Sequence, residues 1–318
     1  MVRELAIGIY LLIFKCLFSL FNLFPLKEKT TFVVSFGDNA QFLLDEIEKL
    51  NIQKDIVILQ QKSSKINFFE NNSYKVYHFE SAHIIHFIQS IYHLATSRTI
   101  LIDNYFGFLA VTNFKEEVEV IQLWHAAGAV KKFGLLDHSV EKRSHMAKKR
   151  FKKVYEKFHK VVVGSEEMAK IFTQAFDLPS SSILRTGVPR TDFYYDTVLH
   201  RSIKERLYYE FPYLKDKKVI LYAPTYRDGQ LKDAQLELDI KQLYEQLKDE
   251  YVLLIKMHPA ITLNNPIIHD NRYHDFVYDF SNYPNVHELL LITDLLITDY
   301  SSIPMEFSIL RRPMIFYI

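Results

Sequence analysis

The chain of 318 residues has few of the residues whose abundance identifies certain classes of protein. Its one cysteine, Cys16, excludes a disulfide framework and a cysteine-based zinc site. With only 8 glycines and 10 prolines, it is not a fibrous or low-complexity protein. A formal net charge of +1 gives no global sign of a nucleic-acid-binding protein. The remaining composition, 48% hydrophobic and 24% charged, is that of a globular chain of about two domains.

Several signatures of catalysis and metal binding are also absent from the sequence. There is no G-x-x-x-x-G-K-[ST] and no G-x-G-x-x-G, which argues against a P-loop kinase and an ordinary NAD enzyme. The lack of G-x-S-x-G disfavours an α/β hydrolase. His83, His86 and His93 have no acidic residue among them beyond Glu80, so we interpret them as exposed helix histidines. We therefore expect neither a metal ion nor a cofactor.

What is present begins with an apolar segment at residues 5–26, interrupted by Lys15, Ser19 and Asn22. No small-residue cleavage site follows it, as a signal peptide would require. A charge at Lys15, in the middle of the segment, is costly in a spanning helix. The spacings of four and three place the polar residues on one face, which favours a helix lying in a membrane interface. A spanning anchor and a buried N-terminal helix are the alternatives.

The near-zero net charge hides a basic segment at residues 142–160. Nine of its 19 residues are Lys or Arg, and Glu156 is its only acid. Apolar residues such as Met146 and Phe151 recur between the basic ones with helical spacing. A basic amphipathic helix of this kind is typical of binding to an anionic membrane surface. RNA binding and a plain solvated helix are the alternatives, and the apolar N-terminal segment favours membrane.

Between and after these segments, short apolar runs alternate with stretches of helical spacing. This alternation predicts parallel sheets covered on both faces. Two series of strands predict two Rossmann-like domains joined near residues 186–199. The expected strands are 31–35, 55–59, 99–102, 118–123 and 160–163, then 219–223, 251–257, 295–298 and 314–317. The expected helices between them are 39–50, 81–95, 240–249 and 304–310.

The apolar run 314–317 predicts a last, buried strand, and the sequence stops one residue later. A parallel strand ordinarily returns through a helix, so the second sheet would be left half-covered. We therefore expect the chain to be a fragment that lacks the end of its second domain.

In doubly wound sheets ligands bind at the carboxyl ends of strands, so polar residues there are candidates for function. His125 follows one strand in Q-L-W-H-A-A-G-A, with Gly128 and Gly134 allowing close backbone turns, and histidine suits proton transfer near neutral pH. Arg190, in G-V-P-R-T-D at the domain junction, could clamp a phosphate. A structural histidine and a linker arginine are the plainer alternatives.

The second series of strands carries similar residues. Thr225 and Arg227 follow the strand that ends at Pro224 and could bind an anion, or form a solvated turn. Lys256 and His258 alternate along the end of the next strand, so both can point to one side and stabilise phosphate charge.

The last candidate segment is T-D-Y-S-S, which follows the strand that ends near Asp299. Pro304 opens a helix there, and the start of a helix with Ser301 and Ser302 can bind an anion. Simple capping by the two serines is the alternative. Glu306, one turn into the helix, is oriented to accept hydrogen bonds from ribose hydroxyls.

Taken together and in order, these segments resemble the CDP-glycerol glycerophosphotransferase family of wall teichoic acid synthesis. The residues that carry the resemblance are W-H-A-A-G-A-V-K-K-F-G, G-V-P-R-T-D, Y-A-P-T-Y-R-D, I-K-M-H-P and T-D-Y-S-S-x-x-x-E, all within 124–306. The resemblance implies an α/β, GT-B-like fold, two Rossmann-like domains with a cleft between them. The apolar segment at residues 5–26 adds an N-terminal membrane-associating helix before them. The expected parts are a membrane segment 1–28, an acceptor domain 29–187 and a CDP-glycerol-binding domain 188–318.

The family's functional residues carry over by motif match. His125 corresponds to the catalytic base, and His258 to a second essential histidine that stabilises phosphate together with Lys256. The other positions implied to contact substrate are Ala126, Ala127, Gly128, Ala129, Arg190, Pro224, Thr225, Met257, Ser301, Ser302 and Glu306. Arg227 is added on charge grounds alone.

One departure separates branches of the family. Chain-extending polymerases read W-H-G-T-P-L-K-K, whereas this chain is similar to the W-H-A-S-G-A-L-K form of the primase, with Ala127 in place of Ser. The resemblance implies transfer of glycerol 3-phosphate from CDP-glycerol to undecaprenyl-diphosphate-linked ManNAc-GlcNAc, with release of CMP. The enzyme would be peripheral on the cytoplasmic face of the membrane, with no nucleic-acid partner and homo-oligomerisation left open.

Three alternative functions remain on sequence grounds. A poly(glycerol or ribitol phosphate) polymerase and a capsule-type GT-B glycosyltransferase would use the same fold. A noncatalytic membrane-bound scaffold of a polymer-synthesis complex would not need both His125 and His258, and their presence argues against it.

Overall fold

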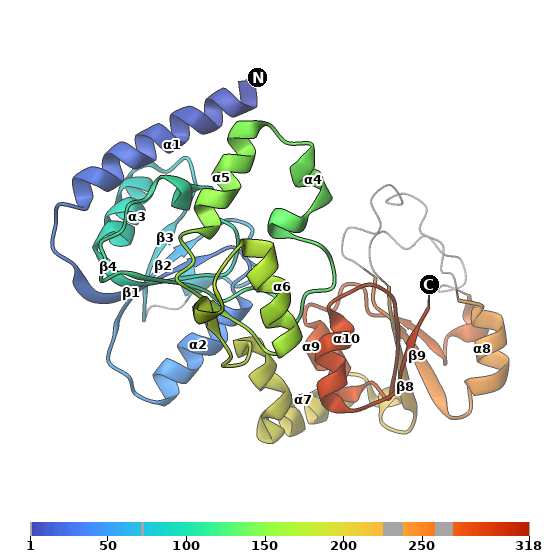
Figure 1. Ribbon diagram of the computed structural model, residues 1–318. Coiled ribbons are helices and arrows are strands. Elements are labelled where there is room, and N and C mark those ends of the chain that lie inside the picture. The colour runs from blue at the N-terminus through green and yellow to red at the C-terminus, as the bar shows by residue number, and fades with distance from the viewer. Residues whose placement is uncertain (1, 71–72, 225–237, 258–269, 318) are drawn as a thin grey trace. The chain divides into compact units, whose positions relative to one another are not determined.

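A computed structural model describes residues 2–70, 73–224, 238–257 and 270–317. The chain divides into two compact units, Met1–Asp192 and Phe193–Ile318 (Figure 1). Each unit is built on one parallel sheet, as the alternation of strands and helices predicted.

The first unit contains a seven-stranded sheet in the order β3-β2-β1-β4-β5-β6-β7, in which every pairing is parallel. Alternate residues of β1 point to opposite faces. Val33 belongs to a large core with Phe158 and Phe172, while Phe32 and Val34 pack with residues of α2. The sheet is therefore buried on both faces. Its strands are β1 (Lys27–Val34), β2 (Asp55–Gln60), β3 (Lys75–His78), β4 (Ser97–Ile102), β5 (Glu119–Gln122), β6 (Lys160–Val162) and β7 (Ile183–Leu184).

The helices of this unit begin at residues suited to capping. Ser144 and Ser165 accept hydrogen bonds from the first turns of α5 and α6, respectively. The unit's helices are α1 (Val2–Phe21), α2 (Asp38–Lys49), α3 (Ile84–Thr96), α4 (His138–Glu141), α5 (His145–Tyr155) and α6 (Glu166–Phe176). Short 3-10 turns include η2 (Gly107–Val111), η3 (Gly134–Leu136) and η5 (Pro189–Tyr195).

Helix α1 packs one side on the first unit and leaves another side exposed. Phe14 and Phe18 are fully buried against the core beneath α3 and η2, and Asn22 donates to the carbonyl of Asn113 at 3.1 Å. Lys15 and Ser19 are exposed, whereas Asn22 is half-buried. Large apolar side chains are exposed as well, namely Leu5, Ile9, Leu12, Ile13 and Leu20. By length and composition α1 could cross a membrane, a test that buried helices and signal sequences also pass.

The second unit contains a five-stranded parallel sheet in the order β10-β9-β8-β11-β12. Ile220, Leu253 and Ile297 form its core together with Ile240 of α8. The strands are β8 (Lys218–Ala223), β9 (Tyr251–Ile255), β10 (Val277–Asp279), β11 (Leu295–Thr298) and β12 (Met314–Phe316). The helices are α7 (Thr197–Glu210), α8 (Ile240–Leu247), α9 (Val286–Ile292) and α10 (Ile303–Phe307).

All the predicted strands are present, but the last one is not buried as expected. Ile315 and Phe316 are 47% and 55% exposed. The reason is strand order, because β12 pairs only with β11 and forms an edge of the sheet in the part of the chain that the structure describes. Strands β3, β7 and β10, with four, two and three residues, were not predicted because such short runs give little periodic signal.

Candidate active site

His125 lies just after β5, at the carboxyl edge of the first sheet, on a strained turn. Trp124 before it has a φ of 62°, in the left-handed region that costs a non-glycine residue roughly 1–3 kcal/mol. Gln122 accepts from the Trp124 N–H at 2.9 Å, and the Asn39 amide donates to the Trp124 and Leu123 carbonyls at 2.7 and 3.1 Å. These bonds hold the turn in a conformation that the sequence alone does not favour.

The surroundings of His125 determine which ring nitrogen can accept a proton. Its Nδ1 lies 2.9 Å from the main-chain carbonyl of Asp103, and a carbonyl can only accept, so Nδ1 carries the hydrogen. Nε2 is then the basic nitrogen. The ring stacks between Phe36 and Trp124, at centroid distances of 4.1 and 4.3 Å. Burial lowers the pKa of His125, so the imidazole is neutral near pH 7 and suited to act as a base.

Asp103 fixes the carbonyl that orients His125. Its buried carboxylate accepts hydrogen bonds from the main-chain N–H groups of Ser35, Phe36 and Gly37, at 2.9 to 3.1 Å. Burial raises the pKa of Asp103, and the same N–H groups oppose that rise. Gly37 has a φ of +96°, and a Cβ there would lie 2.9 Å from the Ser64 hydroxyl. Asp103 directly follows a predicted strand, so the strand-end rule could have identified it.

Arg190 is brought to the same place by η5. Its guanidinium donates to the carbonyl of His125 at 2.8 Å and lies 3.6 Å from the carboxylate of Asp38. Its main-chain N–H donates to the Asn39 side chain at 2.9 Å. Arg190 therefore belongs to the first compact unit, which ends at Asp192. Ala126, Ala127, Gly128 and Ala129 continue from His125 as a half-buried loop.

The second unit carries its predicted residues at the carboxyl ends of β8, β9 and β11. Pro224 follows β8. Lys256 follows β9 and donates to the carbonyl of Ser281 at 2.6 Å, and the Met257 N–H donates to the Ser281 hydroxyl at 3.2 Å. The Met257 side chain is buried. The loop after β10, which holds Ser281, is thus fastened to the end of β9.

After β11, the two serines differ in what they contact. The Ser301 hydroxyl accepts a hydrogen bond from the N–H of Ile303, the first residue of α10, at 3.3 Å. Ser302 occupies the N-cap position without a side-chain capping bond. Thr298 donates to the Ala223 carbonyl at 2.6 Å and ties β11 to β8. Pro304 lies in the first turn of α10, as predicted.

Glu306 of α10 is buried within a small polar cluster. Its carboxylate lies 3.5 Å from Nδ1 of His287 on α9, and that nitrogen lies 2.7 Å from the Tyr194 hydroxyl. His287 therefore lies beside both the Glu306 carboxylate and the Tyr194 hydroxyl. Neither His287 nor Tyr194 was predicted, because neither follows a strand or belongs to one of the motifs.

Three predicted residues, Thr225, Arg227 and His258, lie outside the residues that the structure describes. Within the described ranges, no group of three or more His, Cys, Asp or Glu residues could hold a metal ion.

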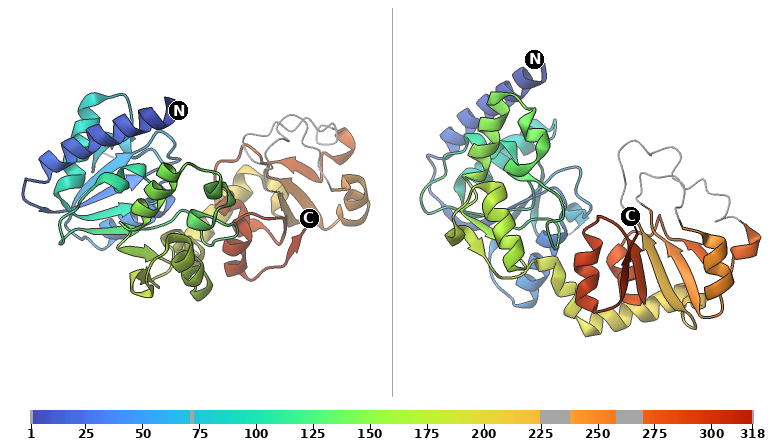
Figure 2. Two further views of the ribbon diagram at one scale, coloured as in Figure 1. Left: turned by 45° about the horizontal axis from the view of Figure 1, so that its top comes forward. Right: turned by 45° about the vertical axis from the view of Figure 1, so that its right-hand side comes forward.

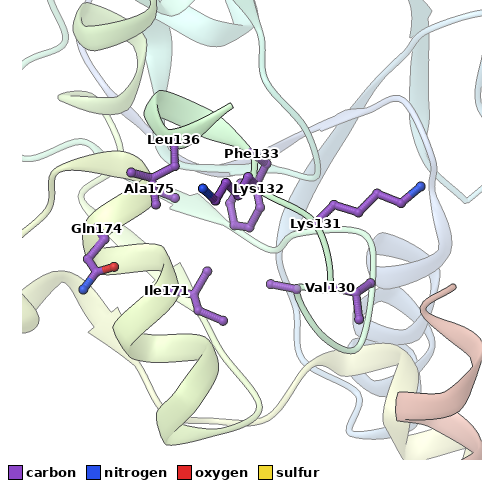
Figure 3. A pocket seen from close by; sticks show the side chains of 9 residues that line it. Val130, Lys131, Lys132, Phe133, Leu136, Ile171, Gln174 and Ala175 are labelled. Atoms are coloured by element: carbon purple, nitrogen blue, oxygen red, sulfur yellow. The ribbon is translucent and has the colours of Figure 1, made fainter. Parts of the chain in front are cut away.

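A cavity of about 230 Å³ lies beside the loop that follows His125 (Figure 3). Its walls come from the loop before and within η3 and from one face of α6. The residues that line it are Ala129, Val130, Lys131, Lys132, Phe133, Leu136, Ile171, Gln174 and Ala175.

Two parallel α/β units with polar residues at the carboxyl ends of their strands are the features of a GT-B-like fold. The same fold occurs in a variant of the wall teichoic acid polymerase TagF soaked with CDPG. The TM-score is 0.73 at 22% identity, over 100% of this chain and 79% of that one. The chain belongs to the CDP-glycerol:poly(glycerophosphate) glycerophosphotransferase family, whose model matches residues 16–318. The expected family, fold and enzyme class are thereby confirmed.

Curated relatives include both branches considered from the sequence. The teichoic acid glycerol-phosphate primase of Bacillus subtilis (strain 168) is 39% identical over 318 residues, covering 99% of this chain and 80% of the relative. The teichoic acid poly(ribitol-phosphate) polymerase of Bacillus spizizenii is 34% identical, covering 96% of this chain and 47% of the relative. The match over most of the primase's length agrees with the primase-like form of the His125 motif.

Proposed function

We propose that this chain is a teichoic acid glycerol-phosphate primase. It would transfer glycerol 3-phosphate from CDP-glycerol to a hydroxyl of undecaprenyl-diphosphate-linked ManNAc-GlcNAc and release CMP. Membership of the family and the likeness to the Bacillus subtilis primase support this choice. The observation that carries the chemistry is His125, a neutral imidazole whose Nδ1 is engaged with the Asp103 carbonyl and whose Nε2 can accept a proton.

In the proposed reaction, the acceptor oxygen attacks the phosphorus that bears glycerol. His125 Nε2 takes the hydroxyl proton, the new P–O bond forms, and the bond between the two phosphates breaks with CMP as the leaving group. Cationic groups offset the charge that develops on the phosphoryl oxygens and on CMP. We assign that role to Lys256 and His258, with Arg190 beside the His125 carbonyl.

We assign donor binding to the second unit. Ser301 and Ser302 at the start of α10 would bind the phosphates, and Glu306 would accept hydrogen bonds from the ribose. The carboxyl ends of β8, β9 and β11, where these residues lie, are the usual ligand edge of such a sheet. Thr225 and Arg227, outside the described residues, remain expected members of this site.

We further propose that the first unit docks on the cytoplasmic face of the membrane as a peripheral protein. α1 exposes an apolar side, and α5 exposes Lys148, Lys149 and Lys153. Arg150 of α5 pairs with Glu4 of α1 at 3.4 Å, so the two helices lie side by side (Figures 1 and 2). Apolar contact with the acyl boundary and attraction to anionic lipids would act together.

Vesicle sedimentation tests the docking proposal. Each lysine near an anionic surface contributes about 1 kcal/mol, so replacing both Lys148 and Lys149 by Ala should weaken binding to phosphatidylglycerol vesicles about thirtyfold. Ala at Lys241 and Lys248, exposed on the second unit, is the matched control and should change binding little. Equal binding of the wild type to neutral and anionic vesicles would contradict the proposal.

The proposed reaction is tested by incubating the enzyme with CDP-glycerol and lipid-linked disaccharide and measuring the molecular mass of the product. A primase adds one glycerol phosphate, whereas many units would indicate a polymerase, the alternative that the poly(ribitol-phosphate) polymerase relative favours. Transfer from CDP-ribitol in preference to CDP-glycerol would contradict the proposed donor.

A further inference from the structure

We infer that the cavity between the His125 loop and α6 binds the isoprenoid-diphosphate end of the acceptor. This inference rests on the proposed function and adds a binding site to it. The site would hold the first isoprene carbons on its apolar walls and a phosphate at Lys132.

The chemistry of the walls is the first argument. Six of the nine lining residues are Ala, Val, Phe, Leu or Ile, and none is an acid. The polar lining residues are Gln174, Lys131 and Lys132, so the charge that the lining carries is positive. Sugars need hydrogen-bonding partners on several sides, which this cavity does not offer. An apolar group that carries a negative charge matches it on both counts.

The size of the cavity is the second argument. At about 230 Å³ it is smaller than the roughly 300–1,000 Å³ of sites that enclose a drug-sized ligand. It cannot enclose a nucleotide donor. It suits one amphiphilic end of a larger molecule, with the rest of that molecule outside.

The position of the cavity is the third argument. Phe133 forms one wall and packs on Trp124 at 4.7 Å, and Trp124 stacks on His125 at 4.3 Å. The turn η3, which supplies Leu136 to the cavity, contacts both α6 and the basic helix α5. The lining of the cavity therefore adjoins the proposed membrane-binding helix α5, and its Phe133 wall is separated from His125 by the ring of Trp124.

The loop is shaped to form this wall. Gly134 has a φ of +63°, and a Cβ there would lie 2.4 Å from the Ala175 carbonyl, so only glycine lets the loop close onto α6. In Figure 3, Lys132 ends on the side of Leu136 and Ala175, whereas Lys131 extends in the opposite direction. Lys132 is therefore the cation that we assign to the diphosphate.

Inhibition by farnesyl diphosphate tests the assignment with the full-length chain. Farnesyl diphosphate should inhibit CMP release by competing with the lipid acceptor and not with CDP-glycerol. Farnesol and inorganic diphosphate should each inhibit much more weakly, since farnesol lacks the negative charge for Lys132 and diphosphate lacks the apolar chain for the walls. Inhibition that competes with CDP-glycerol, or equal inhibition by diphosphate alone, would overturn the inference.

A charge reversal provides the matched comparison. Lys132→Glu should raise the inhibition constant for farnesyl diphosphate about tenfold or more, with the KM for CDP-glycerol unchanged within about twofold. Lys54→Glu, an exposed site with the same charge change, should leave both constants unchanged. Equal inhibition constants of farnesyl diphosphate for Lys132→Glu and the wild type would overturn the inference.

A direct binding measurement separates this inference from the proposed function. If the wild type releases no CMP with any acceptor, the primase proposal fails. Calorimetric binding of farnesyl diphosphate that Lys132→Glu weakens about tenfold or more would still support the site, and the absence of binding to the wild type would overturn it.

Discussion

Asn39 joins three main-chain segments around His125, and its removal should disable the site. The buried side chain donates to the carbonyls of Leu123 and Trp124 and accepts from the N–H of Arg190. Three hydrogen bonds at about 1 kcal/mol each, with buried groups left unsatisfied, give a loss of about 3 kcal/mol for Asn39→Ala. Trp124 would also lose a restraint on its left-handed conformation, so His125 would move.

The assay for Asn39→Ala combines thermal unfolding with steady-state kinetics. A loss of about 3 kcal/mol in a domain of this size lowers the Tm by about 6–12 °C. We expect kcat to fall more than tenfold at a temperature where the variant is fully folded, since a displaced base catalyses poorly. Asn67→Ala, at an exposed site, is the control. An unchanged Tm and kcat for Asn39→Ala would refute the reasoning.

The remaining predictions concern the base, the ribose site and one glycine. Burial lowers the pKa of His125 below its usual value of 6.5, and the neutral form is the base. The fall in kcat/KM on the acid side should therefore have its midpoint below pH 6.5, and a midpoint above pH 6.5 would contradict this. His287→Ala removes the contact with the Glu306 carboxylate, so it should raise the KM for CDP-glycerol and reduce discrimination against the 2′-deoxy analogue of CDP-glycerol. His287→Gln should restore part of the affinity and part of the discrimination. Equal discrimination by the wild type and both variants would argue against a role for the His287–Glu306 contact. Gly37→Ala should lower stability by about 1–2 kcal/mol in denaturant unfolding, whereas Gly107→Ala, with open space at its Cβ, should not.

Much of the fold could be predicted because buried parallel strands are continuous apolar runs, and the chain has such a run for each long strand. The burial of β12 could not be predicted, since edge position depends on strand order and not on local pattern. The short β7 and β10 were missed for want of periodic signal.

The structure brings together two of the candidate site residues that the sequence offered. His125 was selected because it follows a predicted strand and Arg190 because of its motif, and the Arg190 guanidinium donates to the His125 carbonyl. Asp103 directly follows the predicted strand 99–102 and fits the same rule, whereas Asn39 lies at the start of the predicted helix 39–50 and does not. His287 could not have been found this way, because its contact with Glu306 joins two helices and leaves no local trace in the sequence.

The central claim is that His125 is the base of a glycerophosphate transfer. The most direct test is CMP release by His125→Ala, with CDP-glycerol binding measured in parallel and His138→Ala, at an exposed position, as the control. We predict that His125→Ala lowers CMP release by about 10²–10⁴-fold while it binds CDP-glycerol like the wild type. Near-normal CMP release by His125→Ala would contradict the claim.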